Sequence, residues 1–497
     1  MNNQQTTSTP ALSRQLGLLG LASTGICSML GASIYIVPFM IQRSVPGIGP
    51  NVLPAFMFAA IPAILAAFAY AILASAMPRA GGSYIYASRG LSPYLGFAAS
   101  FSQWFGLSIA IGVVAYVIVP FLRDIAVAAS WDHTAAFLEN GTVRVTVALA
   151  ILWLFVWINI RGIKIYEQTV IPLMVLMFVL GGVVIVTGFI FTQEDFQYTL
   201  LARENRTIPP AISKFKITTF LSAAAVLFSS FIGFDAIAQA GGEAKNPNRS
   251  LPLAIGIAVT VVGSFYMLFT AAVYHAVPWK FIADEAAQHD IYAPALMSYF
   301  LPPLWTIAII GGAAVALTND LPAMLLSVSR LMFAWSEDGI FPKRMTAIHS
   351  RHKTPHFAIL ASGLMATLGV LGSHFAGNFF LGVDIMVTSM LVNFLFMCVT
   401  VLTLPTRNPS LYREIKVAKS RSLQLFVGWV GAIVLAGFLF IHTLKDLNSE
   451  LEAWYFHPTL AWVIVMAVAS GIYVRESSSL KKSGVDMKRQ FSILPPE

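Results

Sequence analysis

The fold of this chain is decided by two apolar stretches, ICSMLGASIYIVP at residues 26–38 and LFSSFIGFDAIAQAGGEAKNP at residues 227–247. Each is apolar enough to belong to a helix that crosses a bilayer, yet each carries small residues where that helix is expected to break. Backbone polar groups cannot face lipid unpaired, so a break at membrane depth is tolerated only where it lines a cavity or is buried in protein. A matched pair of broken spans therefore predicts the substrate site of a transporter.

The composition is typical of a protein with many membrane spans. Of its 497 residues, 57% are hydrophobic and 11% are charged, which is too few charges to cover a soluble surface. The first span follows a polar segment without a cleavage site, so we expect it to be retained rather than removed as a signal peptide. With roughly 20 apolar residues needed per span, the sequence predicts twelve helices, at residues 16–41, 52–77, 95–122, 143–160, 167–191, 218–241, 252–277, 303–333, 356–373, 379–404, 423–443 and 457–474.

The net charge of +8 indicates membrane orientation rather than nucleic-acid binding. If the N-terminus is inside, most of the 31 Lys and Arg residues fall on cytoplasmic segments, as the positive-inside rule requires. Both termini are then cytoplasmic, and the protein is expected in the cell membrane (the inner membrane of a bacterium). Lipid headgroups are the expected partners of basic residues in the C-terminal tail, among them Lys481, Lys482, Lys488 and Arg489.

The order of the spans predicts one membrane domain built from two related halves. Spans one to five (16–217) and six to ten (218–404) align with the broken span first in each half. An odd number of spans per half makes the halves opposite in orientation, which is a 5+5 inverted repeat. Spans eleven and twelve (405–474) are additional, and the chain begins and ends with cytoplasmic segments (1–15 and 475–497).

Five motifs, in matching order and spacing, carry a family resemblance over most of the chain. The run GASIYIVP at residues 31–38 resembles the GSGIFxxP signature of the amino acid–polyamine–organocation permeases. MPRAGGSYIY (77–86) is similar to the family's loop after span two, and NIRGIK (159–164) to the entrance of its span five. FSSFIGFDAIAQAGGEAKNPNRSLPLAI (228–255) is similar to span six with its following loop, and SRLMFAWSEDGIFPKRM (329–345) to the end of span eight.

This resemblance implies an all-α permease with the leucine-transporter-type fold, in which spans one and six are unwound, and neither an enzyme nor a cofactor-dependent protein. Two positions depart from the family pattern. Ser33 stands where a second glycine is usual, and Met177 stands where some proton-coupled members have a lysine. The lysine-based coupling scheme is therefore not carried over to this chain.

The two breaks predict complementary binding groups. A break near Gly31 frees the amides that begin the second half of span one, and their partial positive charge attracts a carboxylate. A break near Gly233 frees carbonyls, which attract an ammonium group. Together they predict a backbone clamp for an α-amino acid, although small residues can also serve only for close helix packing. The resemblance implies the same role for these segments, and the predicted substrate-binding residues are Ile26, Ser28, Met29, Gly31, Ala32, Ser33, Phe228, Ser230, Phe231, Ile232, Gly233 and Phe234.

Three predicted spans contain an acidic residue beyond their first position, and no Lys or Arg lies clearly at mid-depth to neutralise it. Asp320, beside Asn319 in span eight, is the first candidate for proton or cation coupling, with a structural role as the alternative. Asp235 follows the break of span six, where it either caps the next half-helix or handles substrate or protons. Asp384 is expected to reach an aqueous vestibule. No metal site is predicted.

The predicted function is secondary active transport of amino acids by alternating access, as proton symport or as exchange (antiport). An ATP-driven pump would need a Walker loop, and an embedded enzyme would need a nucleophile with a base or metal ligands, and neither pattern occurs. Two alternatives stay open: a transporter of polyamines or other organic amines, and an amino acid sensor with the same fold. The sequence does not identify the amino acid, the coupling ion or the oligomeric state.

Overall fold

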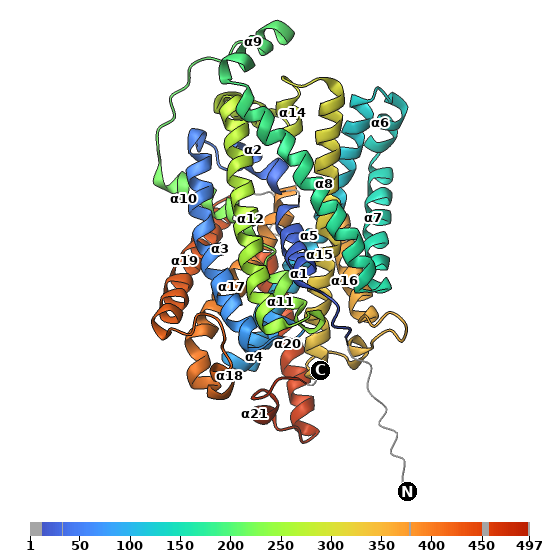
Figure 1. Cartoon of the computed structure of the whole chain (residues 1–497), viewed down its shortest axis with the longest axis vertical. Coiled ribbons are helices and arrows are strands. Elements are labelled where there is room, and N and C mark those ends of the chain that lie inside the picture. Colours follow the sequence, from blue (N-terminus) through green and yellow to red (C-terminus); the bar gives the residue numbers. More distant parts are fainter. Residues whose placement is uncertain (1–11, 32, 377–378, 450–456, 496–497) are drawn as a thin grey trace.

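The computed structural model describes residues 12–31, 33–376, 379–449 and 457–495, and every regular element in these ranges is a helix (Figure 1). Twelve segments of the described chain are long and apolar enough to cross a membrane, as predicted. They are α1 (Leu18–Leu30) with α2 (Ser33–Ser44), α3 (Val52–Ala76), α5 (Pro93–Ala128), α7 (Gly141–Arg161), α8 (Ile163–Ile190), α10 (Ile217–Leu227) with η2 (Phe228–Phe231) and α11 (Asp235–Gln239), α12 (Pro247–Ala276), α15 (Pro303–Glu337), α16 (His356–Ala376), α17 (Phe379–Arg407), α19 (Arg421–Leu447) and α20 (Pro458–Lys482).

Short helices connect these spans at both ends of the bundle. They are η1 (Gly49–Asn51), α4 (Gly82–Gly90), α6 (Asp132–Glu139), α9 (Gln193–Glu204), η3 (Gly241–Glu243), α13 (Trp279–Gln288), α14 (Ala293–Met297), η4 (Lys343–Thr346), α18 (Pro409–Arg413) and α21 (Met487–Gln490). Several spans also run past their predicted ends. The 36 residues of α5 make a helix about 54 Å long at 1.5 Å per residue, whereas the hydrocarbon layer is about 30 Å thick. Apolarity therefore marks only the membrane-embedded part of such a helix.

Spans one and six are interrupted where the sequence predicts. The first changes from α1 to α2 next to Gly31, and the sixth changes from α10 through η2 to α11, with residues 232–234 outside any helix. Gly233 has φ of +132°, a conformation that favours glycine. A Cβ atom there would overlap the backbone carbonyl of Ser28. The two breaks are thus packed against each other, which requires glycine at this position.

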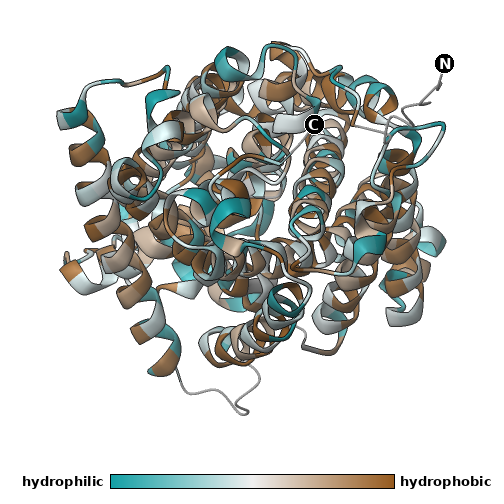
Figure 2. Ribbon diagram, turned by 90° about the horizontal axis from the view of Figure 1, so that it is seen from below, coloured by the Kyte–Doolittle hydropathy of each residue, from teal (hydrophilic) through white to brown (hydrophobic). Residues whose placement is uncertain are grey.

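The helices at the centre of the bundle are buried, whereas helices at its rim expose large apolar side chains. Every residue of α1 from Gly20 to Leu30 is buried, and α5 packs against α15, α16 and α17. By contrast, α8 and α20 expose large apolar side chains, such as Val179 and Val468. Figure 2 shows hydrophobic residues on the outer rim of the bundle as well as between its helices. An apolar rim of this kind is expected to face lipid.

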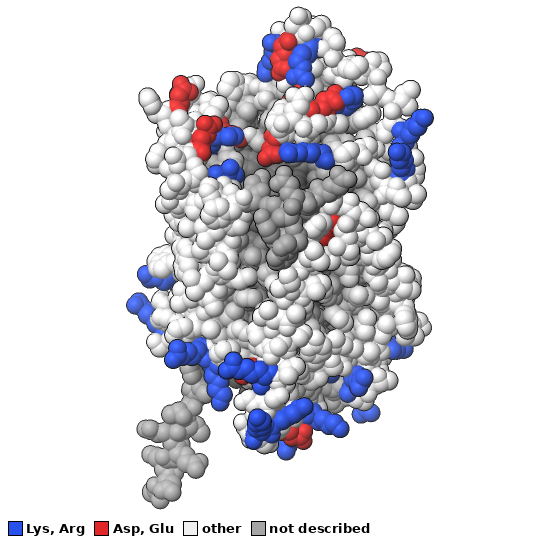
Figure 3. All heavy atoms as spheres, turned by 180° about the vertical axis from the view of Figure 1, so that it is seen from behind, with Lys and Arg blue, Asp and Glu red and all other residues white. Residues whose placement is uncertain are grey.

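Charged residues lie mainly at the two ends of the bundle. The described chain begins and ends at the same end (Figure 1), called here the terminal face. In Figure 3 Lys and Arg predominate at that face, acidic and basic residues mix at the opposite end, and the band between them shows few charges. This distribution is the one that a membrane-spanning protein needs.

Direct contacts at the terminal face join segments of the first five spans to segments of the next five, and one further ion pair lies within the second five. Leu16 forms a parallel β-bridge with Ala244, and Ala80 forms an antiparallel one with Ala240. Arg330 of α15 donates to both carboxylate oxygens of Glu243, and both side chains are buried. Arg89 of α4 forms a second buried ion pair, with Asp338.

We expect Glu243→Ala to destabilise the protein strongly. Removing one partner of a buried ion pair leaves the other charge uncompensated, which costs roughly 3–5 kcal/mol. The control is Asp290→Ala, because Asp290 pairs with Arg43 and both side chains are more than half exposed. Exposed pairs contribute about 0–1 kcal/mol. Thermal unfolding of the purified protein in detergent should show a large fall in melting temperature only for Glu243→Ala, and equal falls would contradict the expectation.

Candidate substrate site

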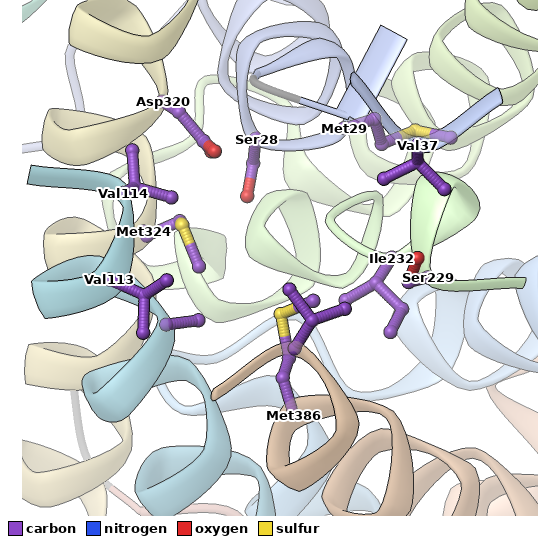
Figure 4. A pocket seen from close by; sticks show the side chains of 12 residues that line it. Ser28, Met29, Val37, Val113, Val114, Ser229, Ile232, Asp320, Met324 and Met386 are labelled. Carbon is purple, nitrogen blue, oxygen red and sulfur yellow. The ribbon is translucent and has the colours of Figure 1, made fainter. Parts of the chain in front are cut away.

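A pocket lies beside the two helix breaks (Figure 4). The empty space between its lining atoms, open solvent included, is about 520 Å³. Six elements, α1, α2, η2 with the residues after it, α5, α15 and α17, contribute the lining, so the pocket joins both halves of the predicted repeat. The lining residues are Ser28, Met29, Val37, Ala110, Val113, Val114, Ser229, Ile232, Asp320, Met324, Val383 and Met386.

Four of the predicted site residues meet in this pocket. Ser28 and Met29 come from the last turn of α1, Ile232 from the break of span six, and Asp320 from α15. Figure 4 shows the side chains of Ser28 and Asp320 directed toward the same space. The breaks that the sequence identifies and the acid of span eight therefore belong to one site.

The aromatic residues predicted at the break of span six pack behind the pocket instead. The ring of Phe228 contacts Phe394 and Phe438, the ring of Phe231 contacts Phe56 and Tyr266, and the ring of Phe234 stacks on Phe394 with centroids 4.9 Å apart. Buried aromatic pairs of this kind stabilise the packing around a site. None of the three lines the pocket.

The remaining predicted residues lie around the breaks. Ile26 and Ser230 are buried and do not line the pocket, and the same is true of Gly31 and Gly233, which form the breaks themselves. Ala32 lies outside the described residues, and so does the side chain of Ser33. The backbone clamp stays a prediction.

Asp320 has an unusual position for an acid in a membrane span. A Cβ atom on Gly31 would overlap its carboxylate, so the carboxylate lies directly against the backbone of the first break. Its Oδ1 atom is buried without a hydrogen-bond partner. Of the twelve residues described as lining the pocket, it is the one with an ionisable side chain. A protein carboxylate thus lies beside the break at which the sequence predicts a substrate carboxylate.

Asn319 and Asp235 differ from Asp320 in having bonded surroundings. The amide nitrogen of Asn319 donates to the Cys27 sulfur at 2.9 Å and to the Val170 carbonyl at 3.2 Å, which joins α15 to α1 and α8. Asp235 Oδ1 accepts from the Gly233 amide, and its Oδ2 accepts from Gln103. These contacts support structural roles for both side chains.

Asp235 also belongs to a buried polar network that crosses the bundle. Gln103 Oε1 accepts from Ser83, Gln239 and Asn393, and Asn393 in turn donates to the Tyr70 hydroxyl. The network joins α3, α4, α5, α11 and α17 without any Lys or Arg among these residues. The side-chain oxygens of Gln239 and Asn393 are buried without a partner. The remaining bonds tie together the helices that they join.

Eight of the lining residues were not predicted from the sequence. Met324 could have been, because it lies four residues after Asp320 and therefore on the same face of α15. Val37 also lies just past the first break. The others come from helices whose facing surfaces cannot be assigned without tertiary contacts, and they are Ala110, Val113, Val114, Ser229, Val383 and Met386.

The lining has a clear chemical character. Eight apolar residues with aliphatic or thioether side chains, together with Ala110, surround two serine hydroxyls and one carboxylate. Ser229 Oγ, like Asp320 Oδ1, is buried without a partner. Such a pocket can accept a small solute with an apolar body and a hydrogen-bond-donating cationic group.

The sequence is similar to those of several transporters. The chain is 26% identical over 489 residues to a branched-chain amino acid permease of Bacillus subtilis (strain 168), with 95% of each chain covered. It is 25% identical over 493 residues to a methylthioribose transporter of the same organism, with 95% of this chain and 96% of that one covered. Human cationic amino acid transporter 4 is 27% identical over 380 residues, which are 73% of this chain.

The match to the human protein covers 56% of its length, so this chain spans little more than half of that relative. The names of these relatives are those of transporters, not of enzymes. A family model described as amino acid permease matches residues 16–484, a range that includes all twelve spans and the whole pocket. With both broken helices inside that range, the chain is a multi-pass membrane protein that belongs to the amino acid permease family.

Proposed function

We propose that this protein is a secondary active transporter that carries amino acids across the cell membrane. The observation that carries the proposal is the pocket between two broken helices, deep in a bundle that belongs to the amino acid permease family. Broken helices at mid-membrane provide backbone groups for a polar solute without exposing them to lipid. The relatives named for amino acid transport support the same class of substrate.

Alternating access between two inverted halves is the proposed mechanism. The ion pair Arg89–Asp338 and the two β-bridges join the first five spans to the next five and hold the terminal face closed. The positive charge of this face supports a cytoplasmic location for it and for both termini. In this conformation the pocket would be closed toward the cytoplasm, and these contacts would break when the protein opens inward.

Coupling to protons or exchange of substrates is proposed in preference to coupling to sodium. Asp320 lines the pocket, so a proton on its carboxylate and a substrate beside it would influence each other directly. Span eight has no adjacent Ser/Thr pair at this depth that could complete a sodium site. Asn319 would orient the helix rather than bind a coupling ion, and Asp235 is the next candidate if Asp320 is not involved.

Transport of an organic amine is the second candidate, and one observation favours it. The Asp320 carboxylate lies against the first break, where it would repel a substrate carboxylate and attract an ammonium group. An amine without a carboxylate would avoid that repulsion. A sensor without net flux is the third alternative, and uptake of labelled substrate into proteoliposomes separates it from both transporters.

Gly31→Leu is expected to abolish transport, because a larger side chain at the first break would displace the Asp320 carboxylate and fill the adjacent pocket. Gly437→Leu is the matched control, since nothing lies within 4 Å of a Cβ atom at Gly437. The measurement is uptake of labelled amino acid into proteoliposomes, alongside the melting temperature. Parental uptake by Gly31→Leu would show that the site lies elsewhere.

We expect uptake to follow an imposed pH gradient or an internal pool of substrate. The physical reason is the single carboxylate in the pocket, which can exchange a proton for a substrate cation or change its charge during the cycle. The measurement is accumulation in sodium-free proteoliposomes with and without a pH gradient, and with substrate preloaded inside. Accumulation that requires sodium and ignores both other conditions would contradict this coupling scheme.

Comparison of amino acids with their decarboxylated amines tests the two substrate classes. The pairs include leucine with isoamylamine and methionine with methylthiopropylamine, and binding is measured as a rise in melting temperature. If Asp320 binds the ammonium group, Asp320→Asn should weaken amine binding about ten- to hundredfold, the cost of losing a charged hydrogen bond. Asp384→Asn removes another membrane carboxylate and serves as the control.

The outcome separates the candidates. Binding of amines alone selects the amine transporter, whereas binding of amino acids alone, unchanged in Asp320→Asn, assigns the ammonium group to the carbonyls of span six. Binding of neither class across a full panel would contradict both proposals.

A further inference from the structure

The C-terminal segment after the last span folds back onto the terminal face. Helix α20 ends at Lys482, the chain turns through residues 483–486, and α21 leads into residues 491–495, which return to the bundle. Figure 1 shows α21 below the bundle and the C-terminus beside it. We call residues 487–495 the strap. Phe491 and Pro495 within it are buried, so the strap is docked rather than free.

The strap is docked on the ion pair between Arg89 and Asp338. Arg89 Nε donates to the carbonyl of Ile493 at 3.2 Å, and its guanidinium carbon lies 5.0 Å from the centre of the Phe491 ring. Gln490 Nε2 donates to the Asp338 carbonyl at 2.8 Å. One segment therefore binds both partners of a buried salt bridge.

Two further contacts extend the strap across the terminal face. Arg79 Nε donates to the Pro495 carbonyl at 3.1 Å, and Asn408 Nδ2 donates to the Ser492 carbonyl at 3.0 Å. Arg79 and Arg89 belong to the connection between the second and third spans, whereas Asp338 and Asn408 follow the eighth and tenth spans. The strap thus bridges the two sets of five spans at the end where they are closed.

The contacts at the terminal face must separate if this end is to open. We propose that the strap is a latch that holds the terminal face closed, and that its release is a condition for opening this end of the pathway. This inference rests on the alternating-access mechanism proposed above, but not on the identity of the substrate. The strap has the right connections for the role, because it binds both sides of the contact that would separate.

The surroundings of the strap allow it to detach without unfolding the bundle. It is attached to α20, whose apolar window is the least buried of the twelve described spans. The side chains of Lys488 and Arg489 are exposed, and most of its bonds use its own backbone carbonyls. Segments with few buried contacts are those that open locally at low cost in free energy.

Thiol labelling at the closed face tests the latch. The reporter is Ala80→Cys, at a buried position of the β-bridge with Ala240, in a chain whose two buried cysteines, Cys27 and Cys398, are replaced by alanine. Labelling in detergent reaches both ends of the protein, so it needs no assumption about orientation. The labelling rate measures how often the terminal face opens.

Two strap variants and one control are compared in the reporter chain. Gln490→Ala with Phe491→Ala removes two docking side chains, and truncation after Val485 removes the whole strap. The first variant loses one hydrogen bond and the contact of a ring with Arg89, and the second loses the four hydrogen bonds of the strap described above. Each should raise the labelling rate about tenfold or more. The control, Lys488→Ser with Arg489→Ser, removes exposed charge but no docking contact and should label at the parental rate.

Labelling at the parental rate in the double alanine variant, with an unchanged melting temperature, would overturn the proposal. If the truncated chain does not fold, the double alanine variant decides the question alone. An equal increase in the control would also overturn it, because charge rather than docking would then be responsible. Failure of the parent protein to transport any amino acid or amine would reject the proposed function but would leave the labelling comparison valid.

Discussion

The structure depends on one constraint, that backbone groups freed by a helix break inside a membrane must find partners within the protein. The two breaks meet this requirement together. Gly233 packs against the carbonyl of Ser28 at a distance that excludes any side chain. Helix α12 supplies a further partner, since Tyr266 donates to the Met29 carbonyl in the last turn before the first break at 3.0 Å. The pocket lies in the space that these contacts leave beside the breaks.

Those features that depend on local chemistry could be predicted from the sequence. Twelve spans follow from apolar length, and both breaks follow from glycine and serine at mid-span, because neither depends on how the helices are packed. The predicted ends of the spans were less accurate. Helices such as α20 continue past the apolar stretch through charged residues, which have high helix propensity. The family resemblance placed these elements in order, and the family model agrees over residues 16–484.

The lining of the pocket could be predicted only in part. Neighbouring residues on a helix point about 100° apart. Asn319 bonds to α1 and α8 whereas Asp320 lines the pocket, and the sequence does not show which of the two faces the site. The contact between Asp320 and Gly31 joins residues almost 300 positions apart, and no local pattern records it. The methionines and valines of α5 and α17 resemble any other apolar residues of a span until the helices are assembled.

Hydrogen bonding separates the two acids that the sequence left as alternatives. Asp235 is held on both oxygens, by the Gly233 amide and by Gln103. Moving it would leave several buried donors without partners, a cost that opposes change during a transport cycle. Asp320 has a buried oxygen without a partner and lies beside open space. A membrane carboxylate that lacks a partner is costly, and a cationic substrate group or a proton in the pocket would remove that cost. The unsatisfied acid is therefore the one with a physical reason to bind.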